Sequence, residues 1–591
     1  MKMEHVWRYT LLGTLFTVMA GLIVVQLLRI QLNRAQVDKF IEQGQSYAGE
    51  WRTFYPVRGQ VYDRWGNLLA GNTTVYQVGV EPANVQNPHT VALALNVVLG
   101  LDYNEVYQNI TQGPTSQLVY LVLDDYVPQE KIDRLQQYAG DINGAYSLGD
   151  NQETPSLKGL AYQPHLRRNY PEKDLASNVL GYVGFDQDGN LHGLYGIEAK
   201  FDELLAGLPQ RLWVPNDPNR AEELPDIPDG TSLMLTIDRE IQATMENILD
   251  TSIEFNGAES GTIIVVEPKT GDILSMATSP RVDLNRYWEY EDFLTGSTPF
   301  NRAISQAYEP GSVFKILTVA AALDNDVIEP ETTFVDTGVF EIGGTHIYNW
   351  NSAAWGPQDI QGCLQHSLNV CLAWIAKETG PKDFYNYMNS FGIGHMTGID
   401  LAGELTGRLK VPGDADWYDA DLGTNSFGQG VSTTPLQMAV AASAIANEGK
   451  IMAPRIVRSI IDNGHQSDIE PRVIGRPIAE ETAKTLSYML AASLEGEAST
   501  AIVEGYELAG KTGTAEIPTP YGYTSHVTNT SFVGWGPVDD PRFLVYIWFE
   551  KPTSSIWGSE VAAIVFSQVV ERLVVIMKIP PDGVRQALAS Q

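Results

Sequence analysis

The chain has 591 residues, and its 43% hydrophobic and 19% charged residues are ordinary for a globular protein. This length exceeds what a single hydrophobic core organises, so two or three domains are expected. Its 72 acidic residues outnumber its 39 basic residues and give a net charge of −33. That balance argues against nucleic acid or an anionic lipid surface as the main partner, because basic patches bind both.

An apolar segment near the start predicts a membrane anchor over residues 9–30, after a short cytoplasmic tail, 1–8. Tyr9 to Leu28 carries no charge and is long enough to cross a bilayer as a helix. Arg29 follows it in place of a small-residue cleavage site, so we expect the segment to stay uncleaved. Basic residues flank both ends and do not orient the span.

Residues 31–228 have a mixed α+β pattern and predict one structural or docking domain. Arg58–Ala70 predicts two strands joined by a turn. Glu198–Leu205 predicts an amphipathic helix that Gly207 closes. The stretch Val214–Asp229, rich in Pro, Asn and Asp, is the expected linker. No nucleophile, base or metal-ligand spacing is found in this part.

Residues 229–577 alternate strand-like and helical patterns, which predicts a second domain of the α/β class, with 578–591 as a tail. Its clearest expected elements are a strand at Leu233–Ile237, a helix at Arg239–Ile253, closing strands at Ser531–Trp535 and Phe543–Phe549, a last helix at Glu560–Val575, and a mostly helical middle up to about Leu494.

Within this domain, Ser312 follows a Pro310–Gly311 turn and is expected as the N-cap of a buried helix, Val313–Leu323. Lys315 lies three residues on, so both side chains project from one face of the first turn. A neutral, desolvated lysine can take the proton of a serine hydroxyl and make it a nucleophile. The pair alone is weak evidence, because a helix cap beside a charge explains it equally well.

Two later stretches change this interpretation. Ser367-Leu-Asn369 opens a second apolar helical run, and Lys511-Thr-Gly-Thr514 follows far downstream. Ser-x-x-Lys, Ser-x-Asn and Lys-Thr-Gly in this order are typical of penicillin-binding proteins and serine β-lactamases. An earlier Lys269-Thr-Gly271 has the same letters but precedes the nucleophile, and its apolar flanks predict a hairpin turn.

The two cysteines, Cys363 and Cys371, bracket the Ser367 stretch. No histidine cluster lies beside them, so a metal site is not expected and no cofactor is predicted. Continuous helix would place them about 12 Å apart, too far for a disulfide. They are therefore expected to be small buried side chains.

With the three motifs placed, nearly the whole chain resembles a class B, monofunctional penicillin-binding protein, a peptidoglycan D,D-transpeptidase. Arg58-Gly-Gln-Val-Tyr-Asp-Arg64 is similar to the family's N-terminal box, and Arg168–Gly184 and Gly193–Glu198 to its pedestal motifs. Ser426–Gly430 with Thr433–Gln437 is similar to its loop-and-helix element near the active site. Residues around Ser531–Pro537 look closer to the septal, cell-division type than to the elongation type.

The resemblance implies a penicillin-binding, serine β-lactamase-like α/β (α+β) transpeptidase domain at 229–577. It also implies a mixed α+β pedestal of the dimerisation type at 31–228. No glycosyltransferase domain is seen, so glycan polymerisation would fall to a partner, expected to be a membrane glycosyltransferase of the SEDS type. The bulk of the chain is expected outside the cytoplasm, on the bacterial cytoplasmic membrane.

The resemblance also assigns roles. Ser312 would attack the penultimate D-Ala of a stem peptide, with Lys315 as its base. Ser367 would relay a proton to the leaving amine, and Asn369 would orient Lys315. Lys511 would add positive charge. The residues expected to bind substrate are Thr512, Gly513 and Thr514, with the backbone N–H groups of Ser312 and Thr514 as oxyanion hole. β-Lactams would stall at the acylated serine.

One departure from the family pattern is Leu368, in the middle of the second motif, where small or polar residues are common. Competing interpretations are a β-lactamase or D,D-carboxypeptidase on the same fold, and a β-lactam sensor or scaffold. The first class is usually shorter and lacks a pedestal, and a scaffold without activity would be expected to lose one of the motif residues. An elongation-type transpeptidase remains a further alternative.

Overall fold

The computed structural model describes residues 6–32, 37, 49–112, 120–145, 154–185, 189, 191–215, 226–290, 300–496, 498–519 and 522–589. The chain divides into two compact units. The first comprises Met1–Val57 with Ala206–Gly230, and the second comprises Arg58–Leu205 with Thr231–Gln591. All three motif stretches therefore lie in the second unit.

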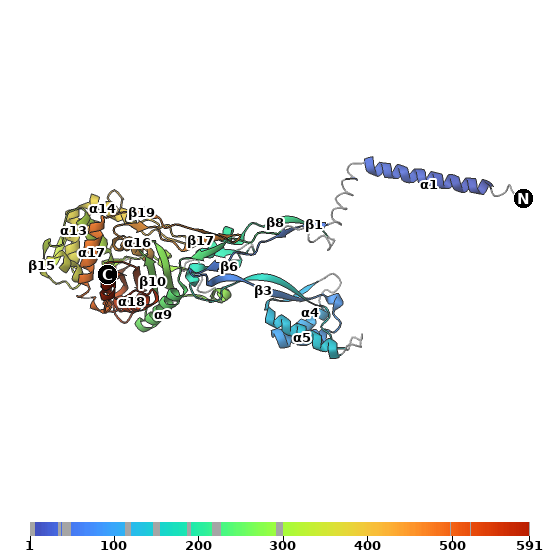
Figure 1. The fold of residues 1–591 in the computed structure, drawn as a ribbon, viewed down its shortest axis with the longest axis horizontal. Helices are drawn as coiled ribbons and strands as arrows, with labels where there is room; N and C mark the ends of the chain where they lie inside the picture. Colours follow the sequence, from blue (N-terminus) through green and yellow to red (C-terminus); the bar gives the residue numbers. More distant parts are fainter. Residues whose placement is uncertain are drawn as a thin grey trace. The chain divides into compact units, whose positions relative to one another are not determined.

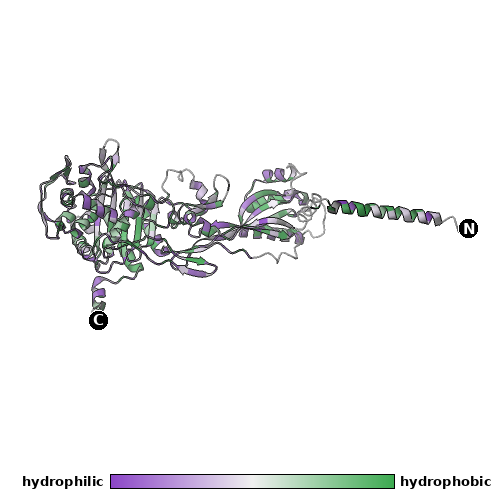
Figure 2. Ribbon diagram, turned by 90° about the horizontal axis from the view of Figure 1, so that it is seen from above, coloured by the Kyte–Doolittle hydropathy of each residue, from purple (hydrophilic) through white to green (hydrophobic). Residues whose placement is uncertain are grey.

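The first unit holds the apolar helix α1 (Val6–Leu32), coloured mostly hydrophobic in Figure 2. Its segment Trp7–Arg29 is long and apolar enough to cross a membrane. Its 27 residues extend about 40 Å at 1.5 Å per residue, more than the hydrocarbon core of a bilayer. The unit also contains a ribbon in which β1 (Gly49–Phe54) pairs antiparallel with β8 (Gln210–Pro215).

The second unit contains a seven-stranded sheet that joins distant parts of the sequence. Its strand order is β18-β17-β9-β2-β3-β4, with β5 also paired to β3. The predicted strand-turn-strand at Arg58–Ala70 is confirmed as β2 and the start of β3. The strands are β2 (Val61–Tyr62), β3 (Leu68–Val80), β4 (Leu121–Pro128), β5 (Leu160–Asn169), β9 (Ser232–Leu235), β17 (Val457–Asp462) and β18 (His465–Asp468).

Three helices pack against the part of this sheet that contains β3: α3 (Pro88–Leu99), α4 (Tyr103–Gln112) and α5 (Gln129–Ala145). They bury an apolar cluster with β3 that includes Val78, Val91, Leu95 and Ile132. This cluster is separate from the two that surround the motif stretches.

A buried carboxylate holds together the segments that resemble the family's pedestal motifs. Glu198 is 1% exposed, and its Oε atoms accept from Arg58 at 2.6 Å and from Arg168 at 2.6 Å. Two guanidinium groups compensate the cost of burying this charge. Glu198 lies in a short helix, α7 (Gly196–Lys200), followed by α8 (Asp202–Ala206). The single helix predicted over Glu198–Leu205 is therefore wrong, because the chain breaks at Phe201.

The expected linker, Val214–Asp229, begins at the end of β8, and most of it lies outside the described residues. The short pair β6 (Tyr182–Phe185) and β7 (Leu191–Leu194) follows α6 (Ser177–Leu180). These elements precede the sheet on which the site is built.

The site is built on a five-stranded antiparallel sheet with the order β11-β10-β22-β21-β20. Lys269–Gly271 forms the turn between β10 and β11, as predicted, and the closing strands are confirmed. The strands are β10 (Ser260–Glu267), β11 (Asp272–Ser279), β20 (Ala509–Thr519), β21 (Gly522–Gly536) and β22 (Phe543–Glu550).

Side chains of β22 alternate between two cores, as the pleat of a strand requires. Val545 and Ile547 pack with α9 (Arg239–Asn256) and α18 (Ala562–Ile576), which lie beside β10 in Figure 1. Leu544 and Tyr546 face the other core, which contains α11 (Lys315–Asp324), α13 (Asn369–Thr379) and α16 (Pro435–Ala446). Helices therefore cover both faces of the sheet.

The expected helical middle is interrupted by small hairpins, which the apolar pattern did not indicate. The remaining elements are α10 (Arg302–Ser305), β12 (Thr333–Asp336), β13 (Val339–Ile342), β14 (Thr345–Tyr348), β15 (Gly356–Asp359), α12 (Ile360–Gln365), α14 (Pro381–Ser390), α15 (Asp419–Asn425), β16 (Ile451–Met452), β19 (Val473–Gly475), α17 (Glu480–Ser493) and α19 (Asp582–Ala589).

Candidate active site

Ser312 lies in a 3-10 turn, η4 (Gly311–Phe314), that runs directly into α11. The expectation that Ser312 is an N-cap is wrong, since Pro310 takes that position with helical backbone angles. Gly311 has φ +61°, and a Cβ there would lie 2.6 Å from the carbonyl oxygen of Thr514. Only glycine permits both this angle and this approach, so the turn brings Ser312 against β20.

Lys315 is the first residue of α11 and is fully buried. Its Nζ donates to the Oγ of Ser367 at 3.0 Å, to the carbonyl oxygen of Ser367 at 2.5 Å and to Oδ1 of Asn369 at 2.8 Å. A buried ammonium or amine must have its hydrogens accepted, and these bonds fix the position of Lys315. Two of the three motif stretches therefore meet at one nitrogen atom.

Ser367 lies between α12 and α13, where the chain turns sharply. Its φ is 52°, an angle that a residue other than glycine rarely adopts. The N–H of Leu368 bonds the carbonyl oxygen of Cys363 at 3.0 Å, and the Leu368 side chain is buried in the core. The uncommon residue in the second motif thus packs away from the polar groups, while its neighbours face Lys315.

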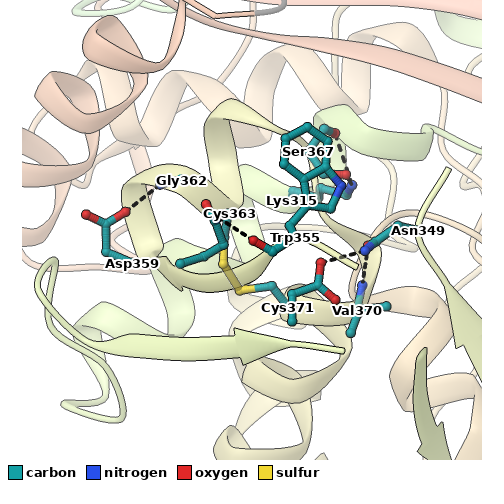
Figure 3. The surroundings of a disulfide bond; sticks show 11 residues. Lys315, Asn349, Trp355, Asp359, Gly362, Cys363, Ser367, Val370 and Cys371 are labelled. Atoms are coloured by element: carbon teal, nitrogen blue, oxygen red, sulfur yellow. Dashed lines mark hydrogen bonds between the residues drawn. A yellow bond between two sulfur atoms is a disulfide. The ribbon is translucent and has the colours of Figure 1, made fainter. Parts of the chain in front are cut away.

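The expectation for the cysteines is wrong: Cys363 and Cys371 form a disulfide, with their Cα atoms 6.1 Å apart. The prediction assumed one continuous helix, whereas the helix is interrupted at Ser367, between the end of α12 and the start of α13, so the spacing of a continuous helix does not apply. Figure 3 shows the bond beneath Ser367 and Lys315. The disulfide therefore closes a loop that contains the whole second motif.

The third motif lies in β20, at the edge of the five-stranded sheet. Lys511 is 5% exposed, and its Nζ donates to the Oγ1 of Thr512 at 3.2 Å. The Oγ1 of Thr514 accepts from the N–H of Gly558 at 3.0 Å. Because a hydroxyl both accepts and donates, Thr514 keeps its hydrogen for an acceptor in the site.

These residues surround a cavity of about 750 Å³. Five of the predicted site residues line it: Ser312, Ser367, Asn369, Thr512 and Thr514. Thr424, Phe427 and Gln429, in and beside the predicted loop-and-helix element, line it as well, which confirms the expected place of that element. Lys315, Lys511 and Gly513 are not among the lining residues, and all three are buried.

Sequence reasoning missed a carboxylate beside the nucleophile turn. Glu309 accepts from the N–H of Gly430 at 3.1 Å and from the hydroxyl of Tyr523 at 3.2 Å. Burial raises the pKa of the Glu309 carboxyl, and the Gly430 bond opposes that shift. Glu309 precedes the Pro310–Gly311 turn directly, so its position in the sequence was the one available indication.

A pair of tryptophans was missed as well. Trp350 and Trp557 both line the cavity. Their rings pack edge to face, with ring centroids 5.2 Å apart. Residues 207 positions apart form this pair, so no local pattern predicts it. The two rings add to the apolar part of the cavity lining, to which Ile347, Phe427 and Ile556 also contribute.

Two family models match the chain. Residues 261–571 match the penicillin binding protein transpeptidase domain, and residues 53–211 match the penicillin-binding protein dimerisation domain. The chain belongs to the class B penicillin-binding proteins. These matches confirm the predicted family and the predicted fold class. Among curated relatives, stage V sporulation protein D of Bacillus subtilis is 31% identical over 93% of this chain and 83% of its own length.

The peptidoglycan D,D-transpeptidase FtsI of Escherichia coli is 26% identical over 98% of this chain and 93% of its own length. Among solved structures, penicillin binding protein 2X of Streptococcus thermophilus aligns with a TM-score of 0.74 at 23% identity, covering 89% of this chain and 80% of its own. Penicillin binding protein 3 of Mycobacterium tuberculosis, complexed with aztreonam, aligns with a TM-score of 0.67 at 24% identity, covering 90% and 98%. These structures share the fold.

Proposed function

We propose that this protein is a membrane-anchored serine D,D-transpeptidase that cross-links peptidoglycan stem peptides in cell-wall synthesis at division. The observation that carries the proposal is the position of the Lys315 Nζ, which bonds Ser367 and Asn369 next to the cavity that Ser312 lines. Family membership and the match to curated D,D-transpeptidases support it.

In the first step, the Oγ of Ser312 attacks the carbonyl carbon of the penultimate D-Ala. Lys315 takes the serine proton, and the backbone N–H groups of Ser312 and Thr514 bind the oxyanion. Ser367, which accepts from Lys315, passes a proton to the nitrogen of the terminal D-Ala. The peptide bond then breaks, and an ester on Ser312 remains.

The terminal carboxylate of the donor binds at Thr512 and Thr514, with Gly513 giving the backbone room between them. Thr514 suits this role because its hydroxyl accepts from Gly558 and still has a hydrogen to donate. Lys511 contributes positive charge to the same end of the cavity. An amine from a second stem peptide then attacks the ester, which forms the cross-link and frees Ser312.

We further propose that α1 anchors the chain in the cytoplasmic membrane with the catalytic unit on the outer side, where peptidoglycan is found. Glycan chains would come from a separate membrane glycosyltransferase of the SEDS type, which we expect to be the partner of this protein. As domain boundaries we propose a tail at 1–8, an anchor at 9–30, a pedestal at 31–228, a transpeptidase domain at 229–577 and a tail at 578–591.

The test is labelling of the full chain, in detergent or membranes, with a fluorescent penicillin, beside a Ser312→Ala variant. We expect a label on the native chain that persists for hours after excess penicillin is removed, and no label on the variant. Loss of the label within seconds would favour a β-lactamase. Equal labelling of both chains would exclude Ser312 as the nucleophile.

A further inference from the structure

A segment outside the three motif stretches contacts the start of α13. It lies between α11 and α12 and contains the two-stranded sheets β12–β15 and β13–β14. Strand β14 ends at Tyr348, and both Tyr348 and Asn349 line the active-site cavity. The reaction steps proposed for Ser312 use neither residue, so their part in the site is open.

Helix α13 begins without a cap of its own. Its N-cap residue, Leu368, makes no capping hydrogen bond through its side chain. The first N–H groups of a helix have no partner inside the helix, so a buried helix start needs acceptors from elsewhere. Here the Oδ1 of Asn349 accepts from the N–H of Val370, 21 residues downstream, at 3.2 Å. Asn349 thus does for α13 what an N-cap side chain usually does.

The same segment also holds Asn369. The Nδ2 of Asn369 donates to the carbonyl oxygen of Tyr348 at 3.2 Å, while its Oδ1 accepts from Lys315. Figure 3 shows Asn349 beside Val370 at the start of the helix. Two consecutive residues of the segment therefore bind two consecutive residues of α13, and one of these contacts the catalytic lysine.

A buried carboxylate determines which way the Asn349 amide faces. Asp336, in β12, is 1% exposed, and Asn349 is 3% exposed. The Nδ2 of Asn349 donates to the Oδ2 of Asp336 at 2.6 Å and to the carbonyl oxygen of Ala353 at 3.0 Å. A carboxylate and a carbonyl only accept, so the amide oxygen must face Val370. Asp336 is itself held by the N–H of Gly338 at 2.7 Å.

We propose that Asn349 is a positioning residue for the transpeptidase reaction and acts through Asn369 on Lys315. Asp336 orients the Asn349 amide, and that amide holds the start of α13. Asn369 is thereby kept where its Oδ1 accepts from the Lys315 Nζ. Because Lys315 must face Ser312 to take its proton, a displacement of Asn369 by about 1 Å is costly. This inference rests on the proposed function and adds to it two residues outside the motifs.

The experiment separates the binding of benzylpenicillin from acylation by it. Stopped-flow acylation of the full chain in detergent, over a range of benzylpenicillin concentrations, gives the dissociation constant of the first complex and the acylation rate constant. The variants are Asn349→Ala and Asp336→Asn, which keeps the side-chain volume but lets the Asn349 amide turn over. Asn256→Ala is the control, because Asn256 is 6% exposed at the end of α9 and its amide bonds Ser252 and Ser554.

We expect the acylation rate constant to fall about tenfold in Asn349→Ala and about threefold in Asp336→Asn, with the dissociation constant within about twofold of the native value. Asn256→Ala should destabilise the fold but leave both constants at their native values. A native acylation rate constant in both test variants, or an equal loss in the control, would overturn the proposal.

A double-mutant cycle tests whether Asn349 acts through Asn369. In an Asn369→Ala background, adding Asn349→Ala should slow acylation by less than about twofold, because the side chain that Asn349 positions is already absent. Equal slowing in both backgrounds would assign the effect to the fold in general and contradict the proposal. If Asn349→Ala yields no folded chain, the same cycle with Asp336→Asn decides. Absence of acylation in the native protein would instead refute the proposed function.

Discussion

The sequence Lys-Thr-Gly occurs twice in the chain, once in an exposed turn and once in a buried strand. Lys269 lies in the hairpin turn between β10 and β11, is 53% exposed and pairs with Asp540. Lys511 lies inside β20, is 5% exposed and points toward Thr512. The first lysine remains in water, whereas the second is buried beside residues that line a cavity.

The difference shows that a short motif acquires chemistry from its surroundings. An exposed lysine is screened by solvent, and its ion pair contributes little. A buried lysine interacts strongly with every charge that forms near it, because the surrounding dielectric is low. The same contrast between matched residues in different surroundings gives the following predictions.

The largest effect should come from substituting the two lysines in parallel. Lys511→Ala is expected to slow acylation by penicillin by about a hundredfold or more, in the range typical of a lost catalytic group. Lys269→Ala should leave the rate within about twofold of the native value. Stopped-flow acylation of both variants measures this. Equal slowing in the two variants would contradict the distinction between the regions.

The next effect concerns the disulfide beneath the second motif. Replacing Cys363 and Cys371 together by alanine frees the loop that carries Ser367 and Asn369. We expect acylation to slow about tenfold, because small displacements of catalytic groups are costly, and the free energy of unfolding to fall by about 2 kcal/mol. Acylation rates divided by the fraction of chains with an active site separate slower acylation from loss of folded protein. Native rates in the double variant would show that the bond does not position the motif.

A third contrast compares two glutamates of α9. Glu246 is 5% exposed, and burial raises the pKa of its carboxyl to about 7, against opposing effects of Arg281, Gln242 and the N–H of Ala176. Its folded-state pKa exceeds the unfolded value. The protonated form therefore stabilises the fold fully below about pH 4.5, and that contribution is lost as pH rises through 7.

Unfolding measured from pH 4.5 to 7.5 should accordingly show a decline in stability that is smaller in Glu246→Gln. The exposed Glu240 on the same helix supplies the control, and Glu240→Gln should retain the native slope. A Glu246→Gln variant with an unchanged slope would assign the pH dependence to other groups.

The smallest effect is expected at the turn. Lys269→Ala removes the exposed pair with Asp540, and it should lower the free energy of unfolding by no more than about 1 kcal/mol. Thermal unfolding at low and high salt measures it. A larger loss would mean that the turn lysine has a structural role that its exposure does not indicate.

Most of the site could be predicted from the sequence because its residues come in three short stretches, each held by local structure. Ser312 and Lys315 share a turn, Ser367 and Asn369 flank the start of a helix, and the strand β20 carries the rest. The sheet and its main helices were predictable as well, from long apolar runs such as Phe543–Phe549.

The predictions that failed concern features that depend on backbone angles and on contacts between distant parts of the sequence. Nothing in the letters indicates that Ser367 adopts φ 52°, and without that turn the cysteines appear too far apart to bond. The Glu309 and Tyr523 pair joins residues 214 positions apart, so neither residue predicts the other. The two-stranded sheets β12–β15 and β13–β14 have short strands whose pattern resembles that of loops.

The most direct test of the central claim, that the three stretches form one acylating site, is to locate the acyl group. The full chain is treated with benzylpenicillin, digested and analysed by mass spectrometry for the modified peptide. We expect one adduct per chain, on Ser312, and no adduct in a Lys315→Ala variant over the same time. An adduct on another residue, or none on the native chain, would contradict it.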